Sequence, residues 1–222
     1  MVLFWQVMNH KSVINLNNIK KSINSIRNNI PEIIAVSKTF QAKDVWPLID
    51  YGHIHFGENK IQEAFSKWNE IKKLNKNIKL HMIGKLQTNK VKTAVQIFDY
   101  IHSVDSIKLV EKISQEQKKL NKIIKIFIQI NIGNEDQKSG VRKENLKELV
   151  LACSDNNLHL LGLMCIPPAD KDPSDFFRDT MILNENFGFR ELSMGMSTDY
   201  LKACQFHSTY LRIGSSIFGT RI

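Results

Sequence analysis

Three stretches, 124-IKIFIQIN-131, 143-KENLKELVLACSDN-156 and 159-HLLGLMCI-166, show the pattern that decides the fold. The first and third are short apolar runs, which are typical of buried strands. The middle stretch repeats its apolar residues with the period of a helix. A helix between two such strands covers one face of a parallel sheet, so this region predicts one repeat of an α/β fold.

The same alternation extends along the rest of the chain. We expect eight strands, at residues 33–37, 53–57, 79–83, 100–104, 124–131, 159–166, 191–194 and 210–213. We expect helices between them at residues 43–50, 58–74, 89–98, 106–120, 143–156, 173–187 and 198–206, and one helix before the first strand, at about 13–29.

Eight such units predict one closed (β/α)8 barrel of the TIM type, with an extra N-terminal helix. The alternative is an open, doubly wound sheet, but no G-x-G-x-x-G sequence follows the first strand. No Gly/Ser-rich linker divides the 222 residues, a length that suits a single α/β barrel. We therefore expect one domain over residues 1–222.

The chain is basic, with a formal net charge of +9. A basic balance suggests anionic partners such as nucleic acid. The lysines, however, stand as isolated pairs such as Lys72-Lys73 on expected helix faces, without interleaved aromatic residues. We interpret the charge as solvated helix surface and expect no nucleic-acid partner.

The compartment is indicated by the cysteines and by the N-terminus. The three cysteines include no C-x-x-C pair, which fits a reducing cytoplasm. The apolar run at residues 1–8 is too short for a signal peptide or a membrane span. We expect a soluble cytoplasmic protein that does not associate with membranes.

Chemistry in such a barrel lies at the carboxyl ends of the strands. Lys38 closes the first strand, where partial burial would lower the pKa of its amine. A neutral amine is what Schiff-base formation with an aldehyde requires. The alternative is a lysine that only extends to solvent, and position alone favours that alternative.

Two glycine-and-serine turns follow the last two strands, 193-SMGMS-197 and 212-RIGSSIFG-219. The loops after strands seven and eight are the usual phosphate site of these barrels. Gly214 would let backbone N–H groups approach an anion, and Ser215 would add a hydroxyl donor. Two ordinary turns are the alternative, but their coincidence at both strands favours a phosphate site.

Four further polar residues lie at or near the ends of the expected strands. Arg212 would point to the same side as Gly214, unless it forms only a surface ion pair. Asn59 would line a pocket at the barrel mouth. The pair His53 and His55 has a spacing that can bind a metal, but it begins its strand, far from the mouth, so we expect no metal site.

From about residue 30 onward, the sequence resembles the pyridoxal phosphate (PLP) homeostasis proteins, which are single-domain relatives of the alanine racemase N-terminal barrel. The matching stretches, in order, are 35-AVSKT-39, 56-FGEN-59, 81-HMIGKLQTNK-90, 102-HSVD-105, 138-KSG-140, 162-GLM-164, 192-LSMGMS-197 and 212-RIGSSIFG-219.

The resemblance implies that PLP is the cofactor and that Lys38 holds it as a Schiff base. Arg212 would donate a hydrogen bond to the pyridine nitrogen and leave that nitrogen unprotonated. The other cofactor-binding residues expected are Asn59, Ser193, Met194, Ser197, Gly214 and Ser215.

The family's role is intracellular PLP homeostasis without established turnover, so we expect no catalytic residues. The resemblance also implies a monomer. PLP-dependent apoenzymes would be its further partners. The alternative is an amino-acid racemase, which needs acid/base groups on both faces of its substrate. In alanine racemase a C-terminal β-rich domain supplies the second group. Here the sequence ends at Ile222, and we expect no such domain.

Overall fold

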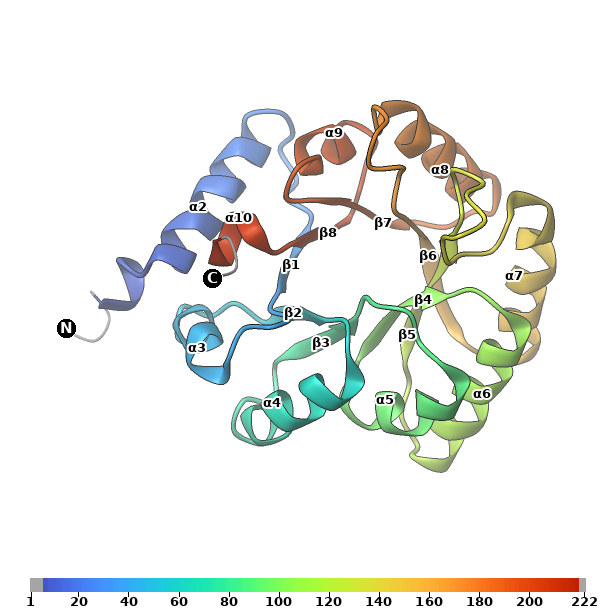
Figure 1. Cartoon of the computed structure of the whole chain (residues 1–222), viewed down its shortest axis with the longest axis horizontal. Helices are drawn as coiled ribbons and strands as arrows, with labels where there is room; N and C mark the ends of the chain where they lie inside the picture. The colour runs from blue at the N-terminus through green and yellow to red at the C-terminus, as the bar shows by residue number, and fades with distance from the viewer. Residues whose placement is uncertain (1–5, 220–222) are drawn as a thin grey trace.

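Eight parallel strands close into a barrel in the computed structural model of the chain, which describes residues 6–219 (Figure 1). Each strand pairs with its neighbour in sequence, and β8 pairs with β1. The strands are β1 (Glu32–Val36), β2 (His55–Glu58), β3 (Lys79–Met82), β4 (Tyr100–Val104), β5 (Lys125–Ile130), β6 (His159–Cys165), β7 (Glu191–Met196) and β8 (Tyr210–Ile213). The predicted (β/α)8 barrel is confirmed.

Helices form a ring around the strands (Figure 1). In chain order they are α3 (Ala42–Asp50), α4 (Ile61–Leu74), α5 (Val91–Ile97), α6 (Ile107–Lys119), α7 (Leu146–Asp155), α8 (Ser174–Asn186) and α9 (Tyr200–Gln205), with the short α10 (Ser215–Phe218) after β8. Short 3-10 turns at Thr88–Lys90 and Lys143–Asn145 precede α5 and α7.

The N-terminal helix α2 (Lys11–Asn24) fills the place in the ring between α9 and α3 (Figure 1). It lies beside α10, where Asn15 Nδ2 donates to the Ile217 carbonyl oxygen at 2.9 Å. On its other side, the Tyr51 hydroxyl donates to Asn17 at 2.8 Å. The extra helix that the sequence predicts therefore covers the seam between the last strand and the first.

Element boundaries differ from the prediction at several points. Helix α2 ends at Asn24, not at residue 29. Strand β2 begins at His55, two residues later than predicted, because the backbone N–H of His53 still donates to the Leu48 carbonyl oxygen of α3 at 2.9 Å. The ends of the predicted domain, residues 1–5 and 220–222, lie outside the described residues.

The apolar side chains form two regions. The larger lies between the sheet and the helices and includes Leu16, Trp68 and Phe177. The smaller fills the barrel, with Phe127 and Tyr210 among its members. This division follows from the alternation of side chains along each strand.

A buried ion pair fixes the strand end that precedes Lys38. The Glu58 carboxylate is fully buried, and its Oε1 accepts from Ser37 Oγ at 2.7 Å and from Lys67 Nζ at 2.9 Å. The same oxygen accepts from Trp68 Nε1 at 2.9 Å. Lys67 Nζ also donates to the Ser37 carbonyl oxygen at 2.7 Å, so α4 holds the carboxyl end of β1.

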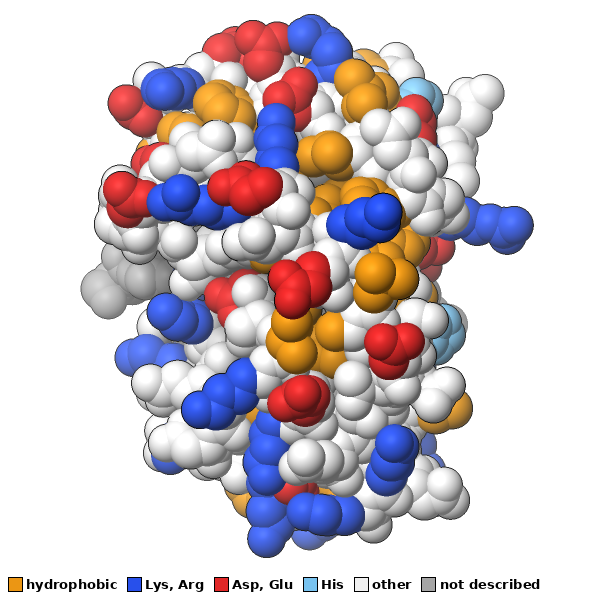
Figure 2. Space-filling model, turned by 90° about the vertical axis from the view of Figure 1, so that its right-hand side faces the viewer, with side chains coloured by type: hydrophobic (Ala, Val, Ile, Leu, Met, Phe, Trp, Pro, Cys, Tyr) orange, Lys and Arg blue, Asp and Glu red, His pale blue; other side chains and the backbone are white. Residues whose placement is uncertain are grey.

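On the face seen in Figure 2, basic and acidic side chains are interspersed, and they do not gather into one basic stripe. Apolar side chains lie between them. In the part of the chain that the structure covers, every helix is too short or too polar to cross a membrane.

We predict that Lys67→Met lowers the free energy of unfolding by about 3–5 kcal/mol, because it leaves the Glu58 carboxylate buried without its cation. The measurement is urea unfolding followed by circular dichroism. Lys73→Met is the matched control on the same helix. Its pair with Glu70 is exposed, so its effect should stay within about 0.5 kcal/mol. Equal losses in the two variants would contradict a special role for the buried pair.

Candidate functional site

A cavity of about 590 Å³ opens at the carboxyl ends of the strands. Six of the residues expected at the site line it, namely Lys38, Asn59, Ser197, Arg212, Gly214 and Ser215. They come from the ends of β1, β2, β7 and β8, which are distant in sequence. The fold therefore brings these predicted residues together at the end of a barrel where chemistry normally takes place.

Lys38 is half-buried, and its backbone is held on both sides. Ser37, before it, is tied to Glu58 and Lys67 as described above. Thr39, after it, has a φ of 70°, which is uncommon for a β-branched residue. The Thr39 N–H donates to Glu63, and the Thr39 hydroxyl donates to the Lys38 carbonyl oxygen. The base of the lysine side chain is thus fixed at the cavity wall.

The turns after β7 and β8 are bound to each other. Ser197 Oγ accepts from the backbone N–H groups of Gly214 at 3.2 Å and Ser216 at 3.3 Å. Gly195, with a φ of +87°, permits the first turn, because a Cβ there would lie 2.6 Å from the Cβ of Ala203. The two joined turns therefore form one wall of the cavity, with Ser197, Gly214 and Ser215 on it.

Two predicted residues, Ser193 and Met194, do not line the cavity. Both are fully buried. The Met194 side chain lies in the hydrophobic core outside the sheet, and Ser193 lies beneath Arg212 inside the barrel.

Apolar walls of the cavity were not predicted. Val36, Ile83 and Ile166 line it, and Phe40 stacks on Phe218 with ring centroids 4.9 Å apart. The available indication was strand alternation, since Val36 stands two residues before Lys38 and therefore faces the same side.

Arg212 is 4% exposed, so it is not the surface ion pair that was the alternative. Its NH1 donates to the Ser193 carbonyl oxygen at 2.7 Å and to Ser193 Oγ at 2.6 Å, and its NH2 donates to the Cys165 carbonyl oxygen at 2.8 Å. Burial lowers the pKa of the guanidinium, but from so high a value that it keeps its charge at neutral pH. One edge of the cavity is therefore cationic.

A row of buried histidines continues from Ser193 through the barrel. His102 Nδ1 lies 2.8 Å from Ser193 Oγ, and its Nε2 lies 2.9 Å from His81 Nδ1. His81 Nε2 lies 2.9 Å from His55 Nδ1, and His55 Nε2 lies 3.2 Å from Glu32 Oε2. The sequence analysis did not predict this row, although the three histidines occupy inward positions on three consecutive strands, β2, β3 and β4.

These histidines are held neutral by burial. Burial lowers the pKa of His81 and of His102 well below the ordinary value, and the charge of Arg212 lowers that of His102 further. The pKa of His55 is lowered for the same main reason, and the pKa of the neighbouring His53 falls to about 4. The barrel interior is thus polar but uncharged between Glu32 and Arg212.

One buried acceptor at the cavity lacks a partner. Asn59 Oδ1 is buried and accepts no hydrogen bond, and Asn59 lines the cavity. Buried polar atoms are normally satisfied, so this oxygen indicates a place for a donor on a ligand. Among residues 6–219, no three His, Cys, Asp or Glu side chains are grouped to hold a metal ion.

A family model described as "Alanine racemase, N-terminal domain" matches residues 14–222. The pyridoxal phosphate homeostasis protein of Aquifex aeolicus is 36% identical over 87% of this chain and 88% of its own length. That of Escherichia coli K12 is 33% identical over 85% of each chain. The chain belongs to the pyridoxal phosphate homeostasis protein family.

Solved structures agree with this membership. PipY from Synechococcus elongatus PCC7942, a structure with PLP bound, is 31% identical, with a TM-score of 0.79 over 90% of this chain and 100% of that chain. The alanine racemase of Clostridium difficile 630 is only 14% identical, with a TM-score of 0.73 over 95% of this chain and 57% of that one. The second likeness concerns the barrel fold alone.

We predict that this family member loses stability as the pH falls below about 6.5, where unfolded histidines become protonated but the four with lowered pKa values, His53, His55, His81 and His102, do not. The folded state then binds fewer protons, so the free energy of unfolding decreases toward acid pH. Each such histidine contributes up to about 1.4 kcal/mol per pH unit. Urea unfolding at several pH values between about 7.5 and 5 measures the slope.

His53→Gln should reduce that slope, because it removes one of the four histidines. His159→Gln, on the exposed start of β6, is the control and should leave the slope unchanged. A wild-type free energy of unfolding that is flat across this range would contradict the prediction.

Proposed function

We propose that this protein binds pyridoxal 5′-phosphate as a Schiff base on Lys38 and serves PLP homeostasis in the cytoplasm without catalytic turnover. The observation that carries the proposal is one cavity with three distinct walls. An amine, a guanidinium and a pair of serine-and-glycine turns face a common space. These groups complement an aldehyde, a ring nitrogen and a phosphate.

The cavity residues fit the cofactor in size and in chemistry. Small-molecule pockets measure about 300–1,000 Å³, and this cavity of about 590 Å³ falls within that range. Val36, Ile83 and Ile166 offer an apolar surface to an aromatic ring. The unpartnered Asn59 Oδ1 offers an acceptor to a donor on the ligand.

Each group has a separate task in this proposal. Lys38 supplies the amine that holds the aldehyde carbon. Ser197 and Ser215 bind the phosphate through their hydroxyl groups, and Gly214, whose N–H donates to Ser197 Oγ, lets the backbone approach the phosphate closely. Bound PLP would supply an electron-accepting ring. Arg212 donates to the ring nitrogen and does not give up its proton, which keeps that acceptor weak.

The two predicted residues outside the cavity have indirect tasks. Ser193 acts by holding the Arg212 guanidinium from below. The side chain of Met194 faces the outer core and its backbone N–H donates to Ser208 Oγ at 3.3 Å, so this residue would support the turn after β7 without contacting the phosphate.

An amino-acid racemase is the weaker alternative. Racemisation requires acid/base groups on both faces of the reacting carbon. Among the described residues that line the cavity, Lys38 and Arg212 are the only ones with ionisable side chains. Arginine cannot act as a base at neutral pH, so one acid/base group is left. This supports PLP binding without turnover, and we further propose a monomer that passes PLP to apoenzymes.

We predict that purified protein incubated with PLP gains an absorbance band beyond that of the polypeptide, and that borohydride fixes the cofactor to Lys38. The borohydride-treated protein is digested, and mass spectrometry locates the modified lysine. Lys38→Ala should abolish both the band and the fixed adduct. Lys85→Ala, which removes a nearby lysine outside this cavity, is the control. An adduct that persists in Lys38→Ala would overturn the assignment of the lysine.

We also predict that Ser215→Asp weakens PLP binding at least about 100-fold, because it places a carboxylate at the proposed phosphate wall. Ser215 is exposed, so the fold should tolerate the change. Pyridoxal, which lacks the phosphate, should lose less than about threefold in affinity. Equal losses for the two ligands, measured by absorbance titration, would place the phosphate elsewhere.

A further inference from the structure

The Arg212 guanidinium is a buried charge without a carboxylate beside it. In the described part of the chain it forms no ion pair, and its acceptors are two carbonyl oxygens and the Ser193 hydroxyl. A buried cation normally requires a counter-charge, because its transfer from water into a low-dielectric interior is unfavourable. Burial lowers the pKa of the guanidinium and the charge of Asp199 raises it without an ion pair, and further compensation must come through the groups to which Arg212 is hydrogen-bonded.

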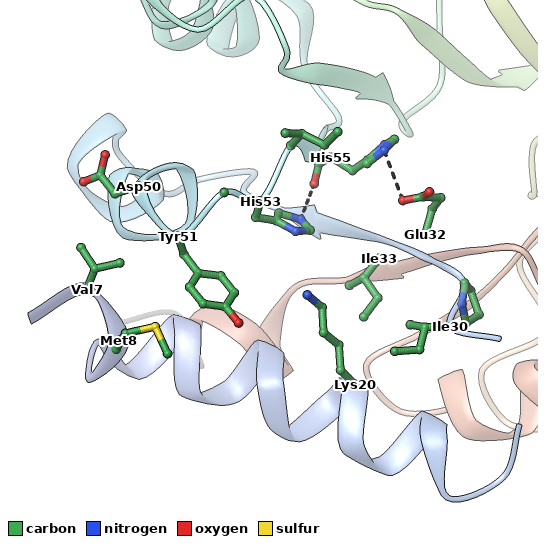
Figure 3. Close-up of a pocket in the computed structure, with 13 residues that line it drawn as sticks. Val7, Met8, Lys20, Ile30, Glu32, Ile33, Asp50, Tyr51, His53 and His55 are labelled. Atoms are coloured by element: carbon green, nitrogen blue, oxygen red, sulfur yellow. Dashed lines mark hydrogen bonds and ion pairs between the residues drawn. The ribbon is translucent and has the colours of Figure 1, made fainter. Parts of the chain in front are cut away.

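A continuous hydrogen-bonded row leads from Arg212 to such a charge. It passes from Ser193 through His102, His81 and His55 and ends at the Glu32 carboxylate, with each step between 2.6 and 3.2 Å. Glu32 lies at the amino end of β1, on the opposite side of the barrel from the mouth. Figure 3 shows this last step, with Glu32 and His55 facing each other.

The carboxylate end of the row decides the direction of its hydrogen bonds. A carboxylate only accepts, so His55 donates from Nε2 to Glu32, and the Nδ1 of this neutral ring must accept. For the same reason His81 donates from Nε2 to His55, and His102 donates from Nε2 to His81. His102 Nδ1 then accepts from Ser193, whose oxygen accepts from Arg212. All three neutral rings must carry their proton on Nε2.

We propose that Ser193, His102, His81, His55 and Glu32 form a one-way hydrogen-bond relay that serves as the counter-charge of Arg212 and positions its guanidinium. Each ring turns its lone pair toward the arginine and its N–H toward the carboxylate. Aligned hydrogen bonds polarise one another, so the negative charge of Glu32 is felt at Ser193. The three histidines are positioning residues, since none of them lines the mouth cavity.

The surroundings of the row fit this role. His81 stacks on Tyr100 with ring centroids 4.1 Å apart, and His102 stacks on Phe127 at 4.5 Å, so the rings cannot turn freely. His81 and His102 are fully buried, which keeps water from competing for their nitrogens. A proton added to either ring would turn its accepting Nδ1 into a donor, which breaks the row, and would place a second positive charge near Arg212.

The carboxylate end of the relay is accessible from outside. Glu32, His53 and His55 line a second cavity of about 690 Å³, which also touches Lys20 and Asp50 (Figure 3). The Glu32 side chain is 56% exposed. A change of charge at Glu32 therefore reaches Arg212 through the relay, whereas other charges in this foot cavity lie outside it. The further claim that such a change alters the binding of a PLP ring beside Arg212 rests on the proposed function.

The direction of the relay is tested directly by nuclear magnetic resonance of protein labelled with 15N-histidine. The nitrogen shifts distinguish a protonated Nε2 from a protonated Nδ1. His55, His81 and His102, assigned by single His→Gln variants, should all be protonated on Nε2 at neutral pH. A proton on Nδ1 of any of the three would overturn the relay, whether or not the protein binds PLP.

The transmission of charge is tested with Glu32→Lys, which replaces the acceptor at the foot with a donor. The relay predicts that His55, His81 and His102 then move their protons to Nδ1, so that Ser193 accepts from both His102 and Arg212. Asp50→Lys makes the same charge change in the same cavity, outside the row, and should leave the His102 signals unchanged. Unaltered His102 signals in Glu32→Lys would overturn the proposal.

The effect of the relay on the cavity at the carboxyl ends of the strands is measured as the affinity for PLP in the same two variants. Glu32→Lys should bind PLP about fivefold more weakly than Asp50→Lys, since only in the first must Arg212 share the Ser193 hydroxyl oxygen with a second donor, His102. Equal affinities would overturn the positioning role. If wild-type protein bound no PLP, the proposed function would fail, and the histidine shifts would still decide whether the relay exists.

Discussion

The pairing of β8 with β1 is the contact on which the fold and the candidate site both depend. Its register sets Ile34 opposite Arg212 and Ala35 opposite Ile213. As a result, Lys38 leaves one strand beside Gly214, which leaves the other. The two strands stand at opposite ends of the chain, so the amine, the guanidinium and the serine turn share a cavity only because the barrel closes.

The strands could be predicted from sequence because each is a local apolar run. Tyr100–Val104 and Tyr210–Ile213 have the predicted bounds. The ends of other elements depend on interactions that a local pattern does not contain. Strand β7 continues to Met196, two residues beyond its predicted end, because Gly195 can adopt a positive φ. Helix α2 ends early at Asn24, where its apolar face no longer meets the barrel.

The candidate site likewise contains residues that could be predicted from the sequence and residues that could not. Lys38 and Gly214 could be predicted because the carboxyl end of a barrel strand has a known place in the fold. The part played by Ser193 could not, because it is defined by Arg212 above it and His102 beside it. Likewise, His81 and His102 are unremarkable in sequence, and they meet only through the stagger between neighbouring strands.

The interior of the barrel holds a row of buried histidines, whereas the layer between the sheet and the helices is filled mainly by apolar side chains. An apolar filling would have given equal or greater stability in many proteins, since buried charges and hydrogen bonds return little net free energy. Directed bonds, however, accept only one arrangement of their partners. The histidines inside the barrel and the Glu58–Lys67 pair outside it both select a single geometry for the strand ends around the mouth.

The position of α2 also affects the order in which the chain can fold. This helix is made early, but Asn15 bonds to Ile217, 202 residues later. During synthesis, α2 can meet α3 early, but its contact with α10 and the pairing of the free edge of β1 with β8 must wait for almost the entire sequence. Contacts of such long range slow folding and leave apolar surface exposed meanwhile. The newly made polypeptide consequently passes through a period in which its open sheet edge is most prone to aggregation or to chaperone binding.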